Sequence, residues 1–199
     1  MNLTLAEKER IQGLIEEGVT RSADRLGKLS RTQWGVMSSS TNEIPVVRLL
    51  SWFSRSSDEH LAAALSAVQD IPTQAVMVFS VKGAAALSEA VTRPWAERMK
   101  ALPDLVELTI GEISNILAQS VIGALADQFG RTVILSVPQV RRGPKAEIVA
   151  AALEGYDGRK DVLLMSHVEL YSNDLAADCS MVLAVDSEAL RMLVRAQPV

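Results

Sequence analysis

Glu112 and Asn115 place a carboxylate and a carboxamide three residues apart, within the otherwise apolar segment 108–127. A helix turns by about 100° per residue, so side chains three and four residues apart are neighbours on one face, and Gln119 would join this pair. A carboxylate can pair with a cation, and a carboxamide can both donate to and accept from a water molecule. The pair could therefore form a chemical site, although the same spacing is common on a solvated helix face.

The segment around this pair has the spacing of a helix. Its apolar residues recur on one side, at Ile110, Ile113, Leu117, Val121 and Ala124. Asparagine is a poor residue inside a helix, because its amide competes for backbone hydrogen bonds, so helix formation does not explain Asn115. The helix is expected to end near Phe129 and Gly130, since glycine commonly stops a helix.

Composition restricts the classes of function. The chain has 199 residues, of which 48% are hydrophobic and 4% aromatic, so an aliphatic core of one large domain or two small ones can form. Its net charge is −4, with acidic and basic residues interspersed, which argues against a nucleic-acid surface. The single cysteine, Cys179, rules out a disulfide within the chain and a cysteine metal cluster. His60 and His167 are far apart and do not pair with other ligands at metal-binding spacing, so we expect no metal site.

The expected location is the cytoplasm. The first ten residues lack the apolar run of a signal peptide. No run of ~18 apolar residues is present either, so we expect no membrane insertion.

Hydrophobic spacing and turn residues predict a mixture of helices and strands. A first helix begins after Thr4, which forms a capping box with Glu7, and runs to about Leu29. Shorter helices are expected at 83–90 and 187–195, and residues 58–67 fit a short helix or a hairpin arm. Strands are predicted at 34–38, 44–53, 74–81, 132–140, 147–153, 162–171 and 180–185. Residues 38–42 are expected to form a polar loop, and residues 141–145 a turn.

The two long helices indicate an internal duplication. When the chain is shifted by 96 positions, Glu16 falls on Glu112. Each long helix is followed by an apolar-Pro-x-Val element, at 44–47 and at 137–140, and each half later contains a strand that leads into a helix. This shared order predicts one domain that spans the chain and consists of two repeats, about 1–96 and 97–199.

These features together resemble the CheC/CheX/FliY phosphatases of bacterial and archaeal chemotaxis, and the length and two-fold organisation look most like CheC. The resemblance covers nearly the whole chain and rests on the Glu-x-x-Asn helix, its weaker copy and the proline element that follows. Residues 112–116, Glu-Ile-Ser-Asn-Ile, are close to the family's usual Glu-Ile-Gly-Asn-Ile, with Ser114 in place of glycine. The implied fold is α+β, with pseudo-two-fold duplicated lobes and an antiparallel sheet across which two long helices pack.

The resemblance implies a phosphatase that hydrolyses the aspartyl phosphate of a CheY-like response regulator. Asn115 would hold the attacking water in line with phosphorus, and Glu112 would pair with a cationic side chain of the regulator. An acyl phosphate is already activated, so no strong general base is needed. The protein would need no cofactor of its own, because the regulator would supply Mg²⁺. The pathway would be chemotaxis or another two-component signalling circuit.

Three further positions bear on this site. Ile116 could contact the regulator or pack against the second long helix, and Gln119 could assist binding or remain a solvated polar residue. In the first repeat Glu16 occupies the glutamate position, but Val19 stands where the family has asparagine and cannot orient water. Glu16 therefore marks a degenerate first site or is a solvated helix residue.

Two other interpretations remain open. The same fold could serve as a non-catalytic adaptor of a chemotaxis or flagellar-switch assembly. Such an adaptor would bind a regulator or CheD, the receptor-modifying deamidase that CheC-like proteins also bind. The presence of both Glu112 and Asn115 favours catalysis, whereas Val19 favours a drift toward binding. Alternatively, the chain has a sheet fold unrelated to this family.

Overall fold

The computed structural model describes residues 4–67, 72–99, 101–128, 130–172 and 175–195. Helices occur at α1 (Leu5–Ser30), α2 (Val46–Phe53), α3 (Val81–Thr92), the 3-10 turn η1 (Arg93–Trp95), α4 (Ala96–Met99), α5 (Leu105–Asp127), α6 (Lys145–Ala152) and α7 (Ser187–Arg195). Strands occur at β1 (Gly35–Glu43), β2 (Glu59–Ala67), β3 (Thr73–Ser80), β4 (Gln139–Pro144), β5 (Asp161–Ser172) and β6 (Leu175–Asp186).

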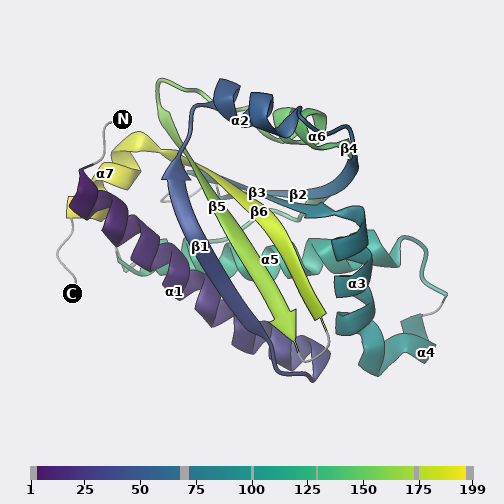
Figure 1. Ribbon diagram of the computed structural model, residues 1–199. Coiled ribbons are helices and arrows are strands. Elements are labelled where there is room, and N and C mark those ends of the chain that lie inside the picture. The colour runs from purple at the N-terminus through teal and green to yellow at the C-terminus, as the bar shows by residue number, and fades with distance from the viewer. Residues whose placement is uncertain (1–3, 68–71, 100, 129, 173–174, 196–199) are drawn as a thin grey trace.

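The strands of the described residues form one antiparallel sheet in the order β1-β5-β6-β3-β2-β4. Helices cover both of its faces, which gives three layers (Figure 1). Because alternate strand residues point to opposite faces, Met77 and Phe79 of β3 pack toward α1, α3 and α5, whereas Val76 and Val78 pack toward α2 and α6. The expected α+β fold with two long helices across an antiparallel sheet is confirmed.

The chain repeats one order of elements, helix-strand-helix-strand-strand-helix. The first set is α1-β1-α2-β2-β3-α3 and the second is α5-β4-α6-β5-β6-α7, with η1 and α4 in the connection between them. Exchanging equivalent strands reproduces the strand order of the sheet, so the sheet has a pseudo-two-fold axis between β3 and β6. Val76 pairs with Val182 at the middle of this strand pair.

Two backbone landmarks define how the halves superimpose. Arg31, at the end of α1, has φ 56°, and Gly130, just after α5, has φ 59°, so both adopt the left-handed conformation that ends a helix. Pro45 and Pro144 stand at the N-caps of the equivalent helices α2 and α6. Both pairs are 99 residues apart, so the 96-residue shift expected from the sequence is wrong by three positions.

Several predicted elements are confirmed. The α1 capping box between Thr4 and Glu7 is present. The strands expected at 74–81, 162–171 and 180–185 correspond to β3, β5 and β6, and residues 58–67 are the hairpin arm β2. The helix around Glu112 is α5, which ends at Asp127, while Phe129 lies outside the described residues.

Two expected strands are helices instead. Residues 44–53 contain α2, in which Leu49 and Phe53 bury one face four residues apart, and residues 147–153 belong largely to α6. Both segments are rich in β-branched or apolar residues, which favours a strand in isolation. A proline at the N-cap and burial against the sheet favour the helix.

Both edge strands were predicted poorly. Residues 38–42, expected as a loop, belong to β1, and residues 141–145, expected as a turn, lie mostly in β4. Conversely, the strand expected at 132–140 is reduced to an isolated bridge at Leu135 before β4 begins. Edge strands carry polar and charged residues that discourage pairing with other chains, so their sequences look like loops.

Candidate functional site

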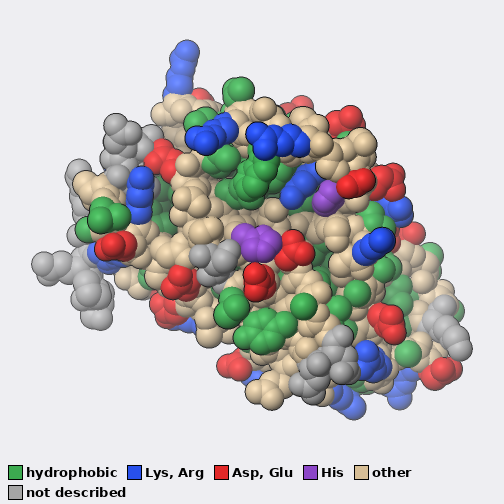
Figure 2. Space-filling view, viewed as in Figure 1, with side chains coloured by type: hydrophobic (Ala, Val, Ile, Leu, Met, Phe, Trp, Pro, Cys, Tyr) green, Lys and Arg blue, Asp and Glu red, His purple; other side chains and the backbone are tan. Residues whose placement is uncertain are grey.

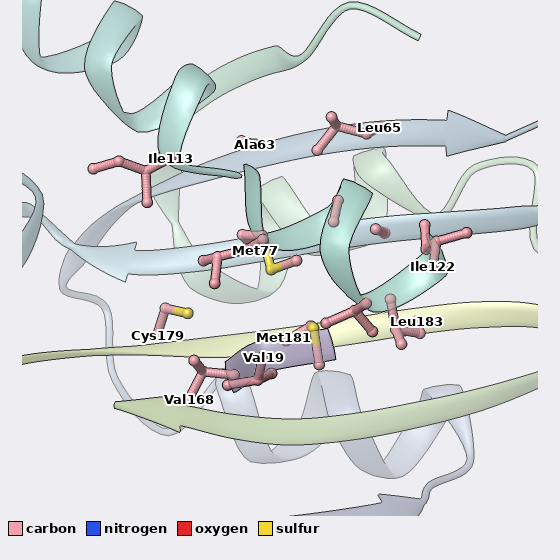
Figure 3. Close-up of a cluster of buried hydrophobic side chains, with 14 of the residues drawn as sticks. Val19, Ala63, Leu65, Met77, Ile113, Ile122, Val168, Cys179, Met181 and Leu183 are labelled. Atoms are coloured by element: carbon pink, nitrogen blue, oxygen red, sulfur yellow. The ribbon is translucent and has the colours of Figure 1, made fainter. Parts of the chain in front are cut away.

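The larger of the two hydrophobic cores lies between the sheet and the helices α1, α3 and α5. One continuous face of α5 is buried in it. Ile110, Ile113, Leu117 and Val121 are fully buried between the sheet and α1. Figure 3 shows Ile113 and Ile122 among the buried side chains contributed by the sheet. A backbone held in this way fixes the direction in which the opposite side of the helix projects its residues.

Glu112 and Asn115 occupy the side of α5 that is turned away from this core. The Glu112 side chain is exposed, and Asn115 is half-buried one turn further along. Within the described residues, neither side chain has a hydrogen bond or an ion pair to another residue of the chain. Their polar atoms are therefore available to a partner or to water, and the helix places them together as the sequence predicts.

The proline element lies against this turn of the helix. A Cβ atom added to Gly111 would meet Val140 Cγ2 at 3.5 Å and Pro138 Cβ at 3.7 Å, both ordinary contact distances. The segment around Pro138 and Val140 therefore packs beside Gly111, the residue next to Glu112. Two features that the sequence singled out, Glu-x-x-Asn and the later proline, therefore meet at one place.

Glu112 borders two surface hollows that sequence analysis did not predict. One, of about 320 Å³, is enclosed by α5 and the proline segment, and the other, of about 130 Å³, lies between α5 and the α3–α4 region. Leu108 lines both hollows and is 59% exposed, while Val137, which lines the first, is 83% exposed. Exposed aliphatic side chains beside unpaired polar groups are typical of a protein-binding surface.

Acidic residues add to this surface. Asp104, the N-cap residue of α5, and Glu107, in the first turn, line the same hollow as Glu112. Three carboxylates around one hollow favour a basic or metal-bearing partner over an acidic one. Neither these residues nor Leu108 and Val137 have a distinctive spacing in the sequence, so only the fold brings them together.

The two expected accessory residues contribute mainly within the chain. Gln119 Nε2 donates to the backbone carbonyl of Val133 at 3.0 Å, which ties α5 to the segment that leads toward Pro138. Ile116 is half-buried and packs against the larger core. Gln119 is thus bonded within the fold and is not the solvated residue that its sequence allowed, whereas a contact of either residue with a partner stays a prediction.

The first repeat presents no equivalent pair. Val19 is fully buried and points into the core near Val168 and Met181 (Figure 3). With the 99-residue register, Gly13 and Glu16 are the counterparts of Glu112 and Asn115. Glu16 is exposed and accepts a hydrogen bond from Gln12 Nε2, as expected of a solvated helix residue.

The described residues also bear on metal binding and on membrane insertion. No group of three or more His, Cys, Asp or Glu side chains among them is arranged to hold a metal ion. One helix, α5, has the length and hydropathy of a membrane span, but 72% of its most apolar window is buried inside the fold, as in a core helix.

Comparisons with known proteins identify the fold. Scans against protein-family models and curated proteins give no match. Among solved structures, Thermotoga maritima FliY is similar with a TM-score of 0.74 and 16% identity, over 97% of this chain and 96% of that one. The FliM middle domain from H. pylori has a TM-score of 0.66 and 7% identity, over 98% and 100% of the two chains.

A chemotaxis protein is also similar. CheX from Desulfovibrio desulfuricans has a TM-score of 0.52 and 11% identity, over 87% of this chain and 99% of that one. At these identities the likeness concerns the fold. The chain thus has the fold shared by FliY, the FliM middle domain and CheX, as its resemblance to the CheC/CheX/FliY phosphatases implied.

Proposed function

We propose that the protein is a phosphatase that hydrolyses the aspartyl phosphate of a CheY-like response regulator in the cytoplasm. The observation that supports this most is the pair Glu112 and Asn115. Both side chains are unpaired within the described residues, and both project from a helix whose other face is fixed in the core. The exposed aliphatic rim formed by Leu108 and Val137 provides a surface on which a regulator can dock.

Asn115 acts on the water. Its amide can accept one hydrogen bond from the water and donate another, which orients the oxygen toward phosphorus without removing a proton. An aspartyl phosphate is a mixed anhydride, so alignment of the nucleophile accounts for much of the required acceleration. Asn115 is half-buried, which restricts its rotamers and the directions from which water can approach.

Glu112 acts on the partner. Its exposed carboxylate pairs with a cationic side chain of the regulator, and this contact sets the register between the two proteins. Asp104 and Glu107 extend the negative charge along the same hollow. Mg²⁺ belongs to the regulator in this proposal and neutralises charge on the phosphoryl group.

A non-catalytic adaptor is the second candidate. FliM, whose middle domain shares this fold, has been solved in complexes with FliG and with SpeE from H. pylori. An adaptor that binds a regulator, CheD or a flagellar-switch component would use the same exposed rim. It would not require an unpaired asparagine beside the glutamate, which is why we favour the phosphatase.

Turnover separates the two candidates. Each phosphorylated response regulator of the source genome is incubated with Mg²⁺, with and without the protein, and loss of its phosphoryl group is followed in time. The phosphatase proposal predicts faster loss for at least one regulator at substoichiometric protein. Stable binding of a regulator without faster loss would support the adaptor and contradict the phosphatase.

A further inference from the structure

A second concave site lies on the other side of the sheet, at α2. One pocket is lined by four residues that follow one another at helical spacing, namely Arg48, Ser51, Trp52 and Arg55. The opposite face of α2 is anchored, because Leu49 is fully buried and Phe53 is 4% exposed. Figure 2 shows basic side chains gathered around a hydrophobic surface in this region, at the top of the view.

The pocket has the size of a small-molecule site. It encloses about 470 Å³ between α2 and the end of β1, where Asn42, Glu43 and Ile44 complete its lining. Trp52 is 50% exposed, so about half of its surface is open to solvent. An exposed tryptophan in a pocket is a platform on which a planar ring can stack.

The two arginines at this site lack internal partners. Within the described residues, neither the Arg48 nor the Arg55 side chain makes a hydrogen bond or an ion pair. By contrast, Arg21 pairs with Asp127, and Arg142 pairs with Glu59. Two free guanidinium groups in the same pocket as an indole ring can bind phosphate oxygens through charge-assisted hydrogen bonds.

The repeat provides an internal comparison. In the 99-residue register, α6 is the counterpart of α2, and Leu49 and Phe53 correspond to the buried residues Ile148 and Ala152. Arg48, Trp52 and Arg55 correspond to Glu147, Ala151 and Glu154. The fold therefore requires the buried positions but not the Arg–Trp–Arg face, which is special to the first half.

Glu43 narrows the choice of ligand. Its carboxylate lies in the same pocket and would repel a phosphate placed beside it. A suitable ligand carries an anionic group at one end and neutral hydroxyl or amino donors at the other. Its anionic group can lie near the arginines while its neutral donors reach Glu43 and Asn42. A nucleotide has this arrangement, together with a ring for Trp52.

We propose that the α2 pocket binds a nucleotide, with the base stacked on Trp52 and the phosphates held by Arg48 and Arg55. This site faces the opposite side of the sheet from Glu112, and the proposal does not depend on the phosphatase activity.

Calorimetric titration of the folded protein tests the proposal, with ATP as the probe and adenosine and inorganic phosphate as its two halves. We expect ATP to bind, and both halves to bind at least about tenfold more weakly, since each supplies only some of the contacts. The double variant Arg48→Gln/Arg55→Gln and the variant Trp52→Leu should each weaken ATP binding by about tenfold or more. Arg25→Gln, an exposed arginine on α1, should leave it unchanged.

Circular dichroism confirms that each variant is folded before its affinity is compared. The proposal is overturned by absence of ATP binding at millimolar concentration, or by equal weakening in Arg25→Gln. It is also overturned if an acidic polypeptide such as polyglutamate binds this face more tightly than ATP, which would assign the arginines to a protein partner.

Discussion

Gly18 of α1 lies directly against the backbone of Val121 in α5. A Cβ atom at Gly18 would be 2.4 Å from Val121 Cα and 2.8 Å from the carbonyl oxygen of Ser120. The two long helices therefore cross where glycine removes the side chain of one of them. The crossing sets the position of α5, and with it the direction of Glu112 and Asn115.

Gly18→Ala should lower the free energy of unfolding by about 1–3 kcal/mol, because backbone atoms must move to admit the methyl group. Gly13→Ala is the matched control on the same helix, since its added Cβ has no atom within 4 Å. That control should stabilise the protein by roughly 0.5–1 kcal/mol through helix propensity. Urea denaturation of both variants checks the pair, and equal effects would contradict the close crossing.

Ser114→Ala should raise the free energy of unfolding by about 1 kcal/mol, because it removes a buried hydroxyl that lacks a hydrogen bond within the described residues. Ser30→Ala is a useful contrast. Ser30 is equally buried, but its hydroxyl accepts from Trp34 Nε1 at 2.6 Å and donates to the carbonyl of Leu26. Its loss should destabilise the protein by about 1–3 kcal/mol. Thermal melts of the two variants should shift in opposite directions.

Much of this fold could be predicted from the sequence, and the errors share a cause. The long helices and the central strands β3, β5 and β6 have clear hydrophobic periodicity, since they are packed on the core. The edge strands β1 and β4 and the short helices α2 and α6 depend on neighbours that are distant in sequence. Local propensity therefore predicts the wrong type of element for these segments. The 96-residue register is wrong for another reason, because it matches Glu16 with Glu112 instead of matching the ends of the two long helices.

The candidate site also combines features that depend on local sequence with features that depend on residues distant in the chain. Glu112 and Asn115 were predictable because three-residue spacing on a helix is a local property. The hollow lined by Asp104, Val137 and Pro138 was not, because it forms only when the segment before β4 folds back against α5.

Glu112→Gln should lower kcat/KM for the phosphorylated regulator by about fivefold at low salt, mainly through KM, because it removes a charge that pairs with the partner. Salt screens exposed charges over about 8 Å at physiological ionic strength, so the difference from wild type should shrink as salt is added. Glu16→Gln, an exposed acid on α1, is the control and should behave as wild type. A salt-independent loss would argue against an ion pair at Glu112.

Cys179 should make stability fall at alkaline pH. Burial, with a smaller effect of Asp178, raises the pKa of its thiol from 9.0 to about 12. The unfolded chain releases this proton first, so the contribution is complete below pH 9.0 and is lost as pH rises toward 12. The slope is at most about 1.4 kcal/mol per pH unit. Denaturation curves across this range should fall less steeply for Cys179→Ala than for wild type; equal slopes would show that the thiol does not contribute.

The most direct test of the proposed activity is the rate at which a cognate regulator loses its phosphoryl group with wild-type protein and with Asn115→Ala. The regulator's affinity for both proteins is measured in parallel. We predict that the variant binds as well as wild type but loses the acceleration by on the order of 100-fold, because the water is no longer aligned. A variant that binds the regulator and dephosphorylates it at the wild-type rate would contradict the assignment of the water to Asn115 and of the site to α5.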